Sequence, residues 1–274
     1  MSAVLPLHEQ ALHEPVSQNS VSEKTQERIL ASVPWAMLAK ILLSITVVYS
    51  LSRVYLHQFA YTVGLDYFEP EFAQFWMPLF WVQASLSAVS LLGVTFYLWR
   101  TRETNWDAVT PEIELIRYFR LIALLAGYTL LVLISGAIQG ESDAAWHQVV
   151  IRDTDFTPTH IGLFYLCIPG LIIFGVASFL YAKTRLPMHN KQSLLALGVA
   201  IGGPVLIMPN VGLNEWGHTF FYAEEVFSAP IHWGFAALGL ALLGLGGVVI
   251  HIAQRMMELI DLVSAGEQES SSAP

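Results

Sequence analysis

The chain has 274 residues, of which 54% are hydrophobic and 13% charged, and its mean hydropathy is +0.53. A soluble domain carries about 25% charged residues, so the composition excludes an ordinary soluble protein and predicts an integral membrane protein. The formal net charge of −9 argues against nucleic acid as a partner. Cys167 is the single cysteine, which excludes an internal disulfide and a thiolate metal cluster.

The N-terminal segment, residues 1–33, is polar and low in aromatic residues. It holds no apolar run of signal-peptide length, so we expect no cleaved leader. Residues 22–32 are expected to form a short amphipathic helix on the membrane surface. The rest of the chain divides into a transmembrane helical domain, residues 34–260, and a tail, residues 261–274, whose Ser- and Glu-rich sequence predicts disorder.

Six apolar runs approach or reach the roughly 20 residues that cross a bilayer as a helix. They cover residues 35–56, 77–99, 118–138, 161–182, 194–208 and 232–250. The fifth is short and contains Gly202, Gly203 and Pro204, which favours a broken or tilted helix. The third follows Thr110 and Pro111, a typical helix start with a capping Thr and Pro at the first position. The sequence therefore predicts an all-α, polytopic membrane helix bundle of about six transmembrane helices.

The basic residues give the orientation, because they gather on the cytoplasmic side of membrane proteins. With the N-terminus inside, all 13 Lys and Arg residues except Arg53 and Arg152 fall on the inner segments. Both termini are then cytoplasmic, and the acidic loops face outward. In a bacterial cell membrane, inner or intracytoplasmic, that outer side is the periplasm.

A polar stretch, residues 141–160, lies between two of the long apolar runs. Asp143 and His147 are four residues apart, so on a helix they share one face. His160 follows after an irregular, Pro-containing segment in which the chain can turn back. Two imidazoles and one carboxylate form the ligand set of non-haem iron and some copper centres. The pattern predicts a metal site, and the alternative interpretation is a loop of solvated polar residues.

Further polar residues between His147 and His160 can support such a site. Arg152, Asp153 and Asp155 can orient the imidazoles through hydrogen bonds. Asp155 is also a rival carboxylate ligand, since it lies nearer to His160 in the sequence. The helical step to His147 favours Asp143.

The pattern nearly repeats at Asn214, His218 and His232, where an amide oxygen replaces the carboxylate. An imidazole in such an apolar and aromatic setting needs a partner. We expect a second metal site with a weaker ligand set, and the alternative is a hydrogen-bonded structural network. Glu224 lies nearby in the sequence, where an acid can serve in proton transfer.

The ends and faces of the apolar spans carry the other notable residues. His57 and His251 lie near span ends and His189 lies in an inner loop; all three are interpreted as interfacial side chains. The last span contains glycines at positions 239, 244, 246 and 247. Small residues let helices approach closely, so this span is expected to pack tightly against another helix or another subunit.

Five stretches carry a resemblance to a known family: GLDYFEPEF (64–72), LWRTR (98–102), WHQVVIRDTDFTPTH (146–160), YAKTRLP (181–187) and PNVGLNEWGHTFFYAEEVFSAPIHWGF (209–235). They resemble the C subunit of the copper membrane monooxygenases, the family of particulate methane monooxygenase and ammonia monooxygenase. The resemblance covers roughly residues 60–235, and its last stretch is highly specific.

The resemblance implies two metal positions, an Asp-His-His site at Asp143, His147 and His160 and an Asn-His-His site at Asn214, His218 and His232. It implies copper, with zinc as an adventitious occupant, and association with subunits A and B in a trimer of heterotrimers. The implied reaction at the first site oxidises methane to methanol, ammonia to hydroxylamine, or another short alkane, with O2. The substrate is small and apolar or uncharged, reaches the site from membrane lipid, and the reductant is external, such as a quinol.

Two other classes of function remain open at this point. A metal or proton transporter is one, since ionisable residues inside a membrane often mark a transport path. Against a transporter, the sequence has no inverted repeat, and all the proposed ligands lie at one face of the membrane, whereas a transport path should continue to the inner face. A purely structural membrane subunit, with the triads as buried polar networks, is the other.

Overall fold

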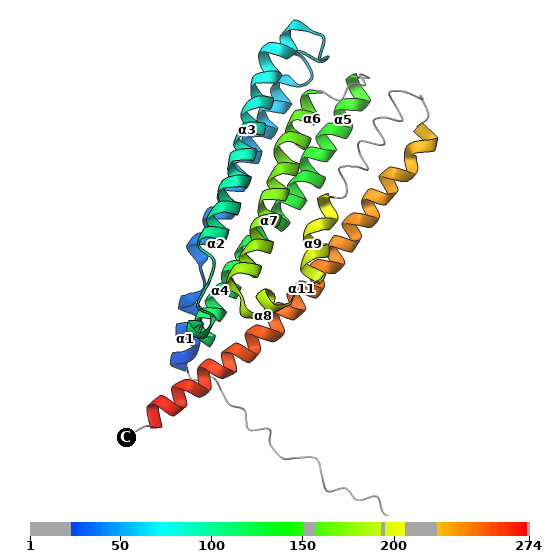
Figure 1. Ribbon diagram of the computed structural model, residues 1–274. Helices are drawn as coiled ribbons and strands as arrows, with labels where there is room; N and C mark the ends of the chain where they lie inside the picture. Colours follow the sequence, from blue (N-terminus) through cyan, green and yellow to red (C-terminus); the bar gives the residue numbers. More distant parts are fainter. Residues whose placement is uncertain (1–22, 151–156, 193–194, 206–223, 273–274) are drawn as a thin grey trace, which may run out of the picture.

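The computed structural model describes residues 23–150, 157–192, 195–205 and 224–272, and this part is a bundle of helices without strands (Figure 1). Its α-helices are α1 (Glu23–Ser32), α2 (Trp35–Phe59), α3 (Pro70–Arg100), α4 (Pro111–Leu133), α5 (Glu141–Val150), α6 (Pro158–Gly162), α7 (Ile168–Arg185), α8 (Pro187–Lys191), α9 (Leu195–Val205) and α11 (Glu224–Ser272). A short 3₁₀ helix, η1 (Trp106–Ala108), and two π-helices, η2 (Ile134–Gly140) and η3 (Leu163–Cys167), complete them. The predicted all-α bundle is confirmed.

Five helical segments in the described part are long and apolar enough to cross a membrane. They are Thr25–Phe59, Pro70–Arg100, Pro111–Val150, Pro158–Arg185 and Gly239–Glu267. The remaining predicted span, residues 194–208, is described only as α9, whose 11 residues rise roughly 16 Å. That length is about half of a hydrocarbon core of about 30 Å.

Helix α9 packs along α11, and the glycines of the last span explain how closely (Figure 1). A Cβ atom on Gly244 would lie 2.8 Å from the backbone nitrogen of Ala200, and one on Gly247 would lie 3.2 Å from Cβ of Ala196. A Cβ on Gly239 or Gly246 would meet no atom within 4 Å. The expected close packing therefore occurs within the chain for two of the four glycines.

The two ends of the described chain meet at the end of the bundle that also holds α8 (Figure 1). The predicted N-terminal helix exists as α1, and it contacts α11. Arg28 makes ion pairs at 2.6 Å with both Glu112 and Glu267. Helix α11 continues past residue 260 to Ser272, although composition predicted disorder there. The Arg28–Glu267 ion pair and the burial of Val263 hold the extension against the bundle.

Three groups of buried side chains hold the bundle together. The largest joins α4, α7, α9 and α11 around Tyr118 and Leu121, which are fully buried. A second joins α2, α4, η3 and α7. The third surrounds Trp76 and Trp146, also fully buried, and joins α2, α3, α5 and α6. This third group includes residues of α5 and α6, the two helices that carry the first predicted triad.

Candidate metal centre

The first triad occupies two helices that meet at one end of the bundle, which we call the triad end (Figure 1). Asp143 and His147 lie one turn apart on α5, as their spacing predicted. His160 lies on α6, whose start is fixed by Thr157 and Pro158. The Thr157 hydroxyl accepts a hydrogen bond from the His160 backbone nitrogen at 3.2 Å. Such N-terminal capping stabilises the start of the short helix that carries the imidazole.

Two buried tryptophans fix this end of the bundle to the connection between α2 and α3. Trp146 Nε1 donates to the Ala60 carbonyl at 2.6 Å, and Trp76 Nε1 donates to the Val63 carbonyl at 2.8 Å. Gly64 allows the connection to turn, because its φ is +56° and a Cβ there would lie 2.6 Å from the Phe72 nitrogen. Trp146 directly precedes His147, so its anchoring holds that imidazole in place.

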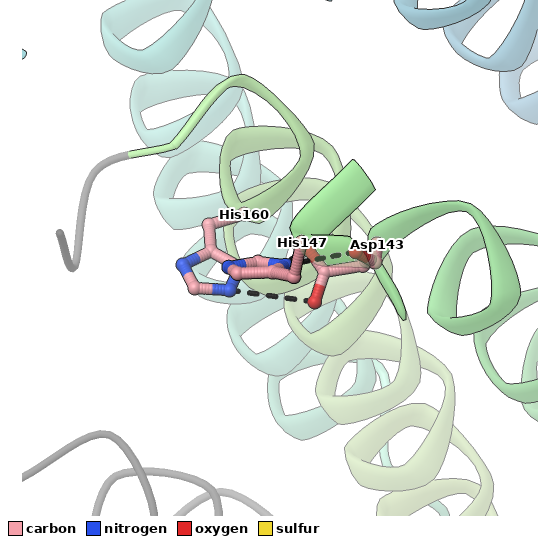
Figure 2. A group of neighbouring side chains, drawn as sticks. All are labelled: Asp143, His147 and His160. Atoms are coloured by element: carbon pink, nitrogen blue, oxygen red, sulfur yellow. Dashed lines mark hydrogen bonds and ion pairs between the residues drawn. The ribbon is translucent and has the colours of Figure 1, made fainter. Parts of the chain in front are cut away.

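The three side chains converge as the sequence predicted (Figure 2). One donor atom from each of Asp143, His147 and His160 lies within 4.8 Å of the other two. His160 Nε2 is 3.3 Å from Asp143 Oδ2, and His147 Nδ1 is 3.7 Å from Asp143 Oδ1. The two imidazole rings are 4.8 Å apart between centroids. The His160 side chain is 2% exposed and that of His147 is 26% exposed, so the group is approached from the His147 side.

The hydrogen bond of the His147 ring leaves one nitrogen lone pair suited to a metal ion. His147 Nδ1 donates to the Asp143 backbone carbonyl at 2.8 Å, which leaves the lone pair on Nε2. That nitrogen is buried and has no hydrogen-bond partner in the described part of the chain, and the same holds for Asp143 Oδ1. Buried polar atoms are normally paired, so these two atoms fit a bound ion. Two imidazoles and a carboxylate suit copper, zinc and iron.

Both helices that carry the triad adjoin a segment of π-helical geometry. Segment η2 directly precedes α5, and η3 follows α6; the two contact each other. A π-turn inserts a residue into an α-helix and is frequent at functional sites. Here Phe164 of η3 packs against His160 with ring centroids 4.7 Å apart.

Several predicted site residues lie outside the described part of the chain. Arg152, Asp153 and Asp155 do so, as do Asn214 and His218 of the second triad. The backbone of α11 includes His232 and Glu224, but their side chains lie outside the description. The structure thus assembles the first triad and does not test the second.

Sequence reasoning missed a set of polar side chains next to the triad. Ser135, Gln139 and Ser142 are 7%, 1% and 1% exposed. Their signal in the sequence is a spacing of four and three residues leading up to Asp143. These three residues were missed because isolated polar residues in or beside an apolar run do not by themselves indicate a site. Arg53 of α2 also faces this region, with Nη2 3.9 Å from Oε2 of Glu141.

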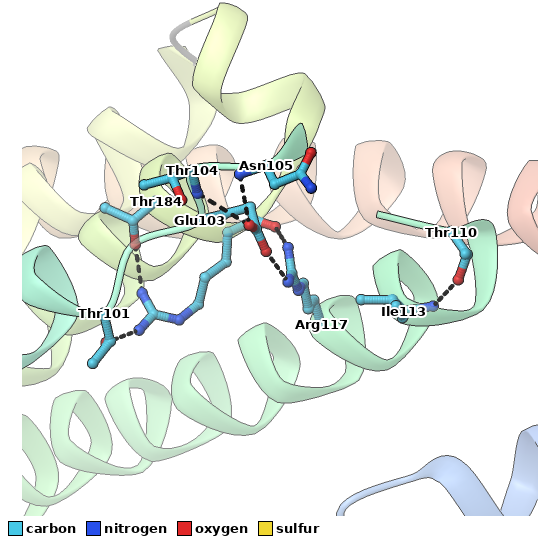
Figure 3. A network of polar contacts seen from close by, with 9 residues as sticks. Thr101, Glu103, Thr104, Asn105, Thr110, Ile113, Arg117 and Thr184 are labelled. Carbon is cyan, nitrogen blue, oxygen red and sulfur yellow. Dashed lines mark hydrogen bonds and ion pairs between the residues drawn. The ribbon is translucent and has the colours of Figure 1, made fainter. Parts of the chain in front are cut away.

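The opposite end of the bundle, which we call the basic end, joins two of the stretches that carry the family resemblance (Figure 3). Arg117 Nη2 donates to Glu103 Oε2 at 2.6 Å, and Arg117 Nη1 donates to the Arg185 carbonyl at 2.7 Å. Arg185 Nη2 donates to the Thr101 hydroxyl at 2.6 Å. The hydrogen bond from Arg117, with those from backbone nitrogens, lowers the pKa of Glu103. Residues 98–102 and 181–187 are therefore joined by hydrogen bonds in the folded protein.

The fold and the triad together define a polytopic helical membrane protein with an Asp-His-His group that can hold a metal ion. A sequence profile for the C subunit of ammonia monooxygenase/methane monooxygenase matches residues 18–263. Because the match covers nearly the whole chain, the protein belongs to this family, and the predicted resemblance is confirmed. No individually curated protein matches the chain. Family membership makes the protein part of a membrane monooxygenase complex.

Proposed function

We propose that this chain contributes a copper site at Asp143, His147 and His160 to a monooxygenase that oxidises methane, ammonia or another short alkane with O2. The observation that carries the proposal is the convergence of the three donor atoms within 4.8 Å, with one imidazole almost fully buried. Imidazole suits both Cu(I) and Cu(II). When bound, copper would supply O2 activation.

The protein's own part in this function is binding, orientation and exclusion of water. The Asp143 carbonyl fixes the His147 tautomer, and the Thr157 cap holds the backbone of α6 at His160. Phe164 and Trp146 provide apolar walls on the two imidazoles. An apolar approach from the bilayer suits a small uncharged substrate that partitions into lipid.

We propose the remaining features on the strength of the family. Asn214, His218 and His232 form a second, more labile copper site, and Arg152, Asp153, Asp155 and Glu224 support the ligands of both sites. Subunits A and B complete the complex as a trimer of heterotrimers in a bacterial membrane, with the triad end facing the periplasm. Electrons come from an external donor such as a quinol.

The test replaces one ligand at a time in the complex purified from its native membrane. His147→Ala is expected to remove one copper per chain and abolish oxidation, because one nitrogen and a carboxylate hold Cu(I) poorly. Asp143→Asn is expected to be milder, since an amide still offers an oxygen. Asp155→Asn is expected to keep the metal and slow the reaction ~10–100-fold, as losses of ligand-orienting residues do.

His57→Ala is the matched control, because His57 is an exposed histidine on α2. Copper per chain and the rate of product formation are measured for all four variants. Full copper and full activity in His147→Ala would show that the triad is not the site. Loss of copper with unchanged oxidation would place the chemistry in another subunit.

A further inference from the structure

A stripe of buried polar side chains runs from the triad into the interior of the bundle. Ser135 and Gln139 lie on η2, and Ser142 lies on α5 one turn further, next to Asp143. At 1.5 Å per residue, the stripe reaches roughly 12 Å below Asp143. The two hydroxyl oxygens and both amide atoms of Gln139 are buried and have no hydrogen-bond partner in the described part of the chain.

Further polar groups lie across from this stripe and at its inner end. Helix α2 contacts both η2 and α6. Its Ser52 hydroxyl and Arg53 Nη1 are likewise buried without a hydrogen-bond partner among the described residues. A Cβ on Gly162, two residues from His160, would lie 3.7 Å from Ser52 Oγ. At the inner end, the buried Cys167 thiol lies near the Ser135 hydroxyl without meeting hydrogen-bond geometry.

Neither lipid nor a helix of a neighbouring protein can satisfy these groups. Lipid tails offer no hydrogen bonds, and each unpaired polar group in an apolar medium costs several kcal/mol. The atoms are buried within this chain, so a helix from outside it does not reach them. Water is small enough to enter, and buried water typically bonds about three otherwise unpaired polar groups. The stripe offers such groups in succession.

We propose that Ser135, Gln139 and Ser142 bind a short file of water molecules beneath the triad, which supplies protons to the metal centre. The file opens to the surface at the Arg53–Glu141 pair, where the Glu141 side chain is 66% exposed. This inference rests on the proposed function. Monooxygenation uses O2, two electrons from the quinol and two protons: one oxygen enters the C–H or N–H bond, and the other leaves as water. Gln139 acts here as a positioning residue.

Cys167 provides a direct probe of this water, because it is the only thiol of the chain. The infrared S–H stretch, isolated by subtracting the spectrum of a Cys167→Ala complex, reports exchange in D2O. We expect exchange in the native complex and a roughly tenfold or slower rate in Gln139→Leu, as an added barrier of about 1.36 kcal/mol would give. Gln139→Glu should exchange as fast as the native complex, since a carboxyl also binds water.

Gln83→Leu is the matched control. Gln83 is a buried glutamine on α3, 6% exposed and with an unpaired side-chain oxygen, and it lies on a different helix from the stripe. Its replacement should leave the exchange rate unchanged. Equal slowing by Gln83→Leu and Gln139→Leu, or no exchange in the native complex, would overturn the proposal. Should Gln139→Leu fail to assemble, Ser135→Ala removes one hydroxyl with little change in volume, and it should slow exchange as well.

Turnover supplies the second measurement. Gln139→Leu should keep its copper, form product more slowly and show a larger solvent isotope effect, because proton delivery then limits the rate. Native copper with an unchanged rate and isotope effect would exclude a role in proton delivery. If His147→Ala still oxidises substrate, the proposed function fails, while the S–H exchange still decides whether the stripe binds water.

Discussion

His189 illustrates what burial does to a single side chain. Its place in a loop of the sequence predicted an interfacial imidazole. In the structure His189 lies on α8 and is buried against the bundle, with 3% of the residue exposed. Burial, followed by the neighbouring His251 and Lys183, lowers its pKa to about 4. The Tyr118 ring contacts it from α4 and the His251 ring from α11, so three other elements, α7 included, enclose it.

This shift predicts how stability depends on pH. The unfolded imidazole titrates near 6.5 and the folded one near 4, so between these values the unfolded chain binds more protons. Stability therefore falls as the pH drops through that window. His189→Leu should reduce the loss in thermal midpoint between about pH 7 and about pH 5, measured by circular dichroism of the complex in detergent. The exposed His57→Leu should not; an unchanged loss in His189→Leu would refute the assignment.

At the triad, the sequence predicted that Asp143 and His147 share one face of α5, because a helical step of four residues is a strong geometric constraint. It could not compare Asp143 with Asp155 by distance, since the Pro-containing stretch between His147 and His160 has no helical spacing in the sequence. In the structure Asp143 lies with both histidines, while Asp155 lies outside the described residues. The unpaired His147 nitrogen and the polar stripe were beyond prediction, because both depend on which atoms tertiary packing leaves without partners.

Among the elements, helices with clear end signals were predicted best. Helix α4 begins at Pro111 after the Thr110 cap, as expected, and the Thr110 hydroxyl accepts from the Ile113 nitrogen at 3.3 Å. Helix α3 begins at Pro70, seven residues before its apolar run, because Glu69 and Pro70 start it outside that run. The π-segments η2 and η3 carry no periodic signal in the sequence, so pattern alone could not place them.

The contact between α9 and α11 yields a prediction at this scale. In Gly244→Ala the new methyl group meets the backbone of α9 at 2.8 Å, and such overpacking typically costs about 1–3 kcal/mol. Gly246→Ala, two residues along the same helix, meets no atom within 4 Å. We expect a lower thermal midpoint of the purified complex for Gly244→Ala only. Equal midpoints for the two variants would mean that α9 does not lie against Gly244.

Over the whole molecule, burial separates the inner helices from the outer ones. In the segment Pro111–Val150, which leads into the triad, 44% of the most apolar 18-residue stretch is buried within the chain. In the segments that contain α2 and α3, only 6% of the corresponding stretch is buried. These two helices therefore offer their apolar faces to lipid or to other subunits, while the segment that leads into the triad is shielded.

The two ends of the molecule differ in charge, and this predicts its orientation. Arg28, Arg117, Arg185 and Arg255 gather at the basic end, where Arg255 also pairs with buried Glu114 at 3.0 Å. Because basic residues stay in the cytoplasm, the triad end should face the periplasm. Asp66→Cys, between α2 and α3, and Asn105→Cys, between α3 and α4, place thiols at opposite ends.

A membrane-impermeant maleimide applied to intact cells distinguishes the two ends. We expect labelling of Asp66→Cys and none of Asn105→Cys until the cells are opened. The unmodified chain is the control, because its only cysteine, Cys167, is fully buried and should not react. Labelling of Asn105→Cys alone in intact cells would invert the orientation. The triad would then face the cytoplasm, where copper and the proposed proton supply would have to reach it from the other side.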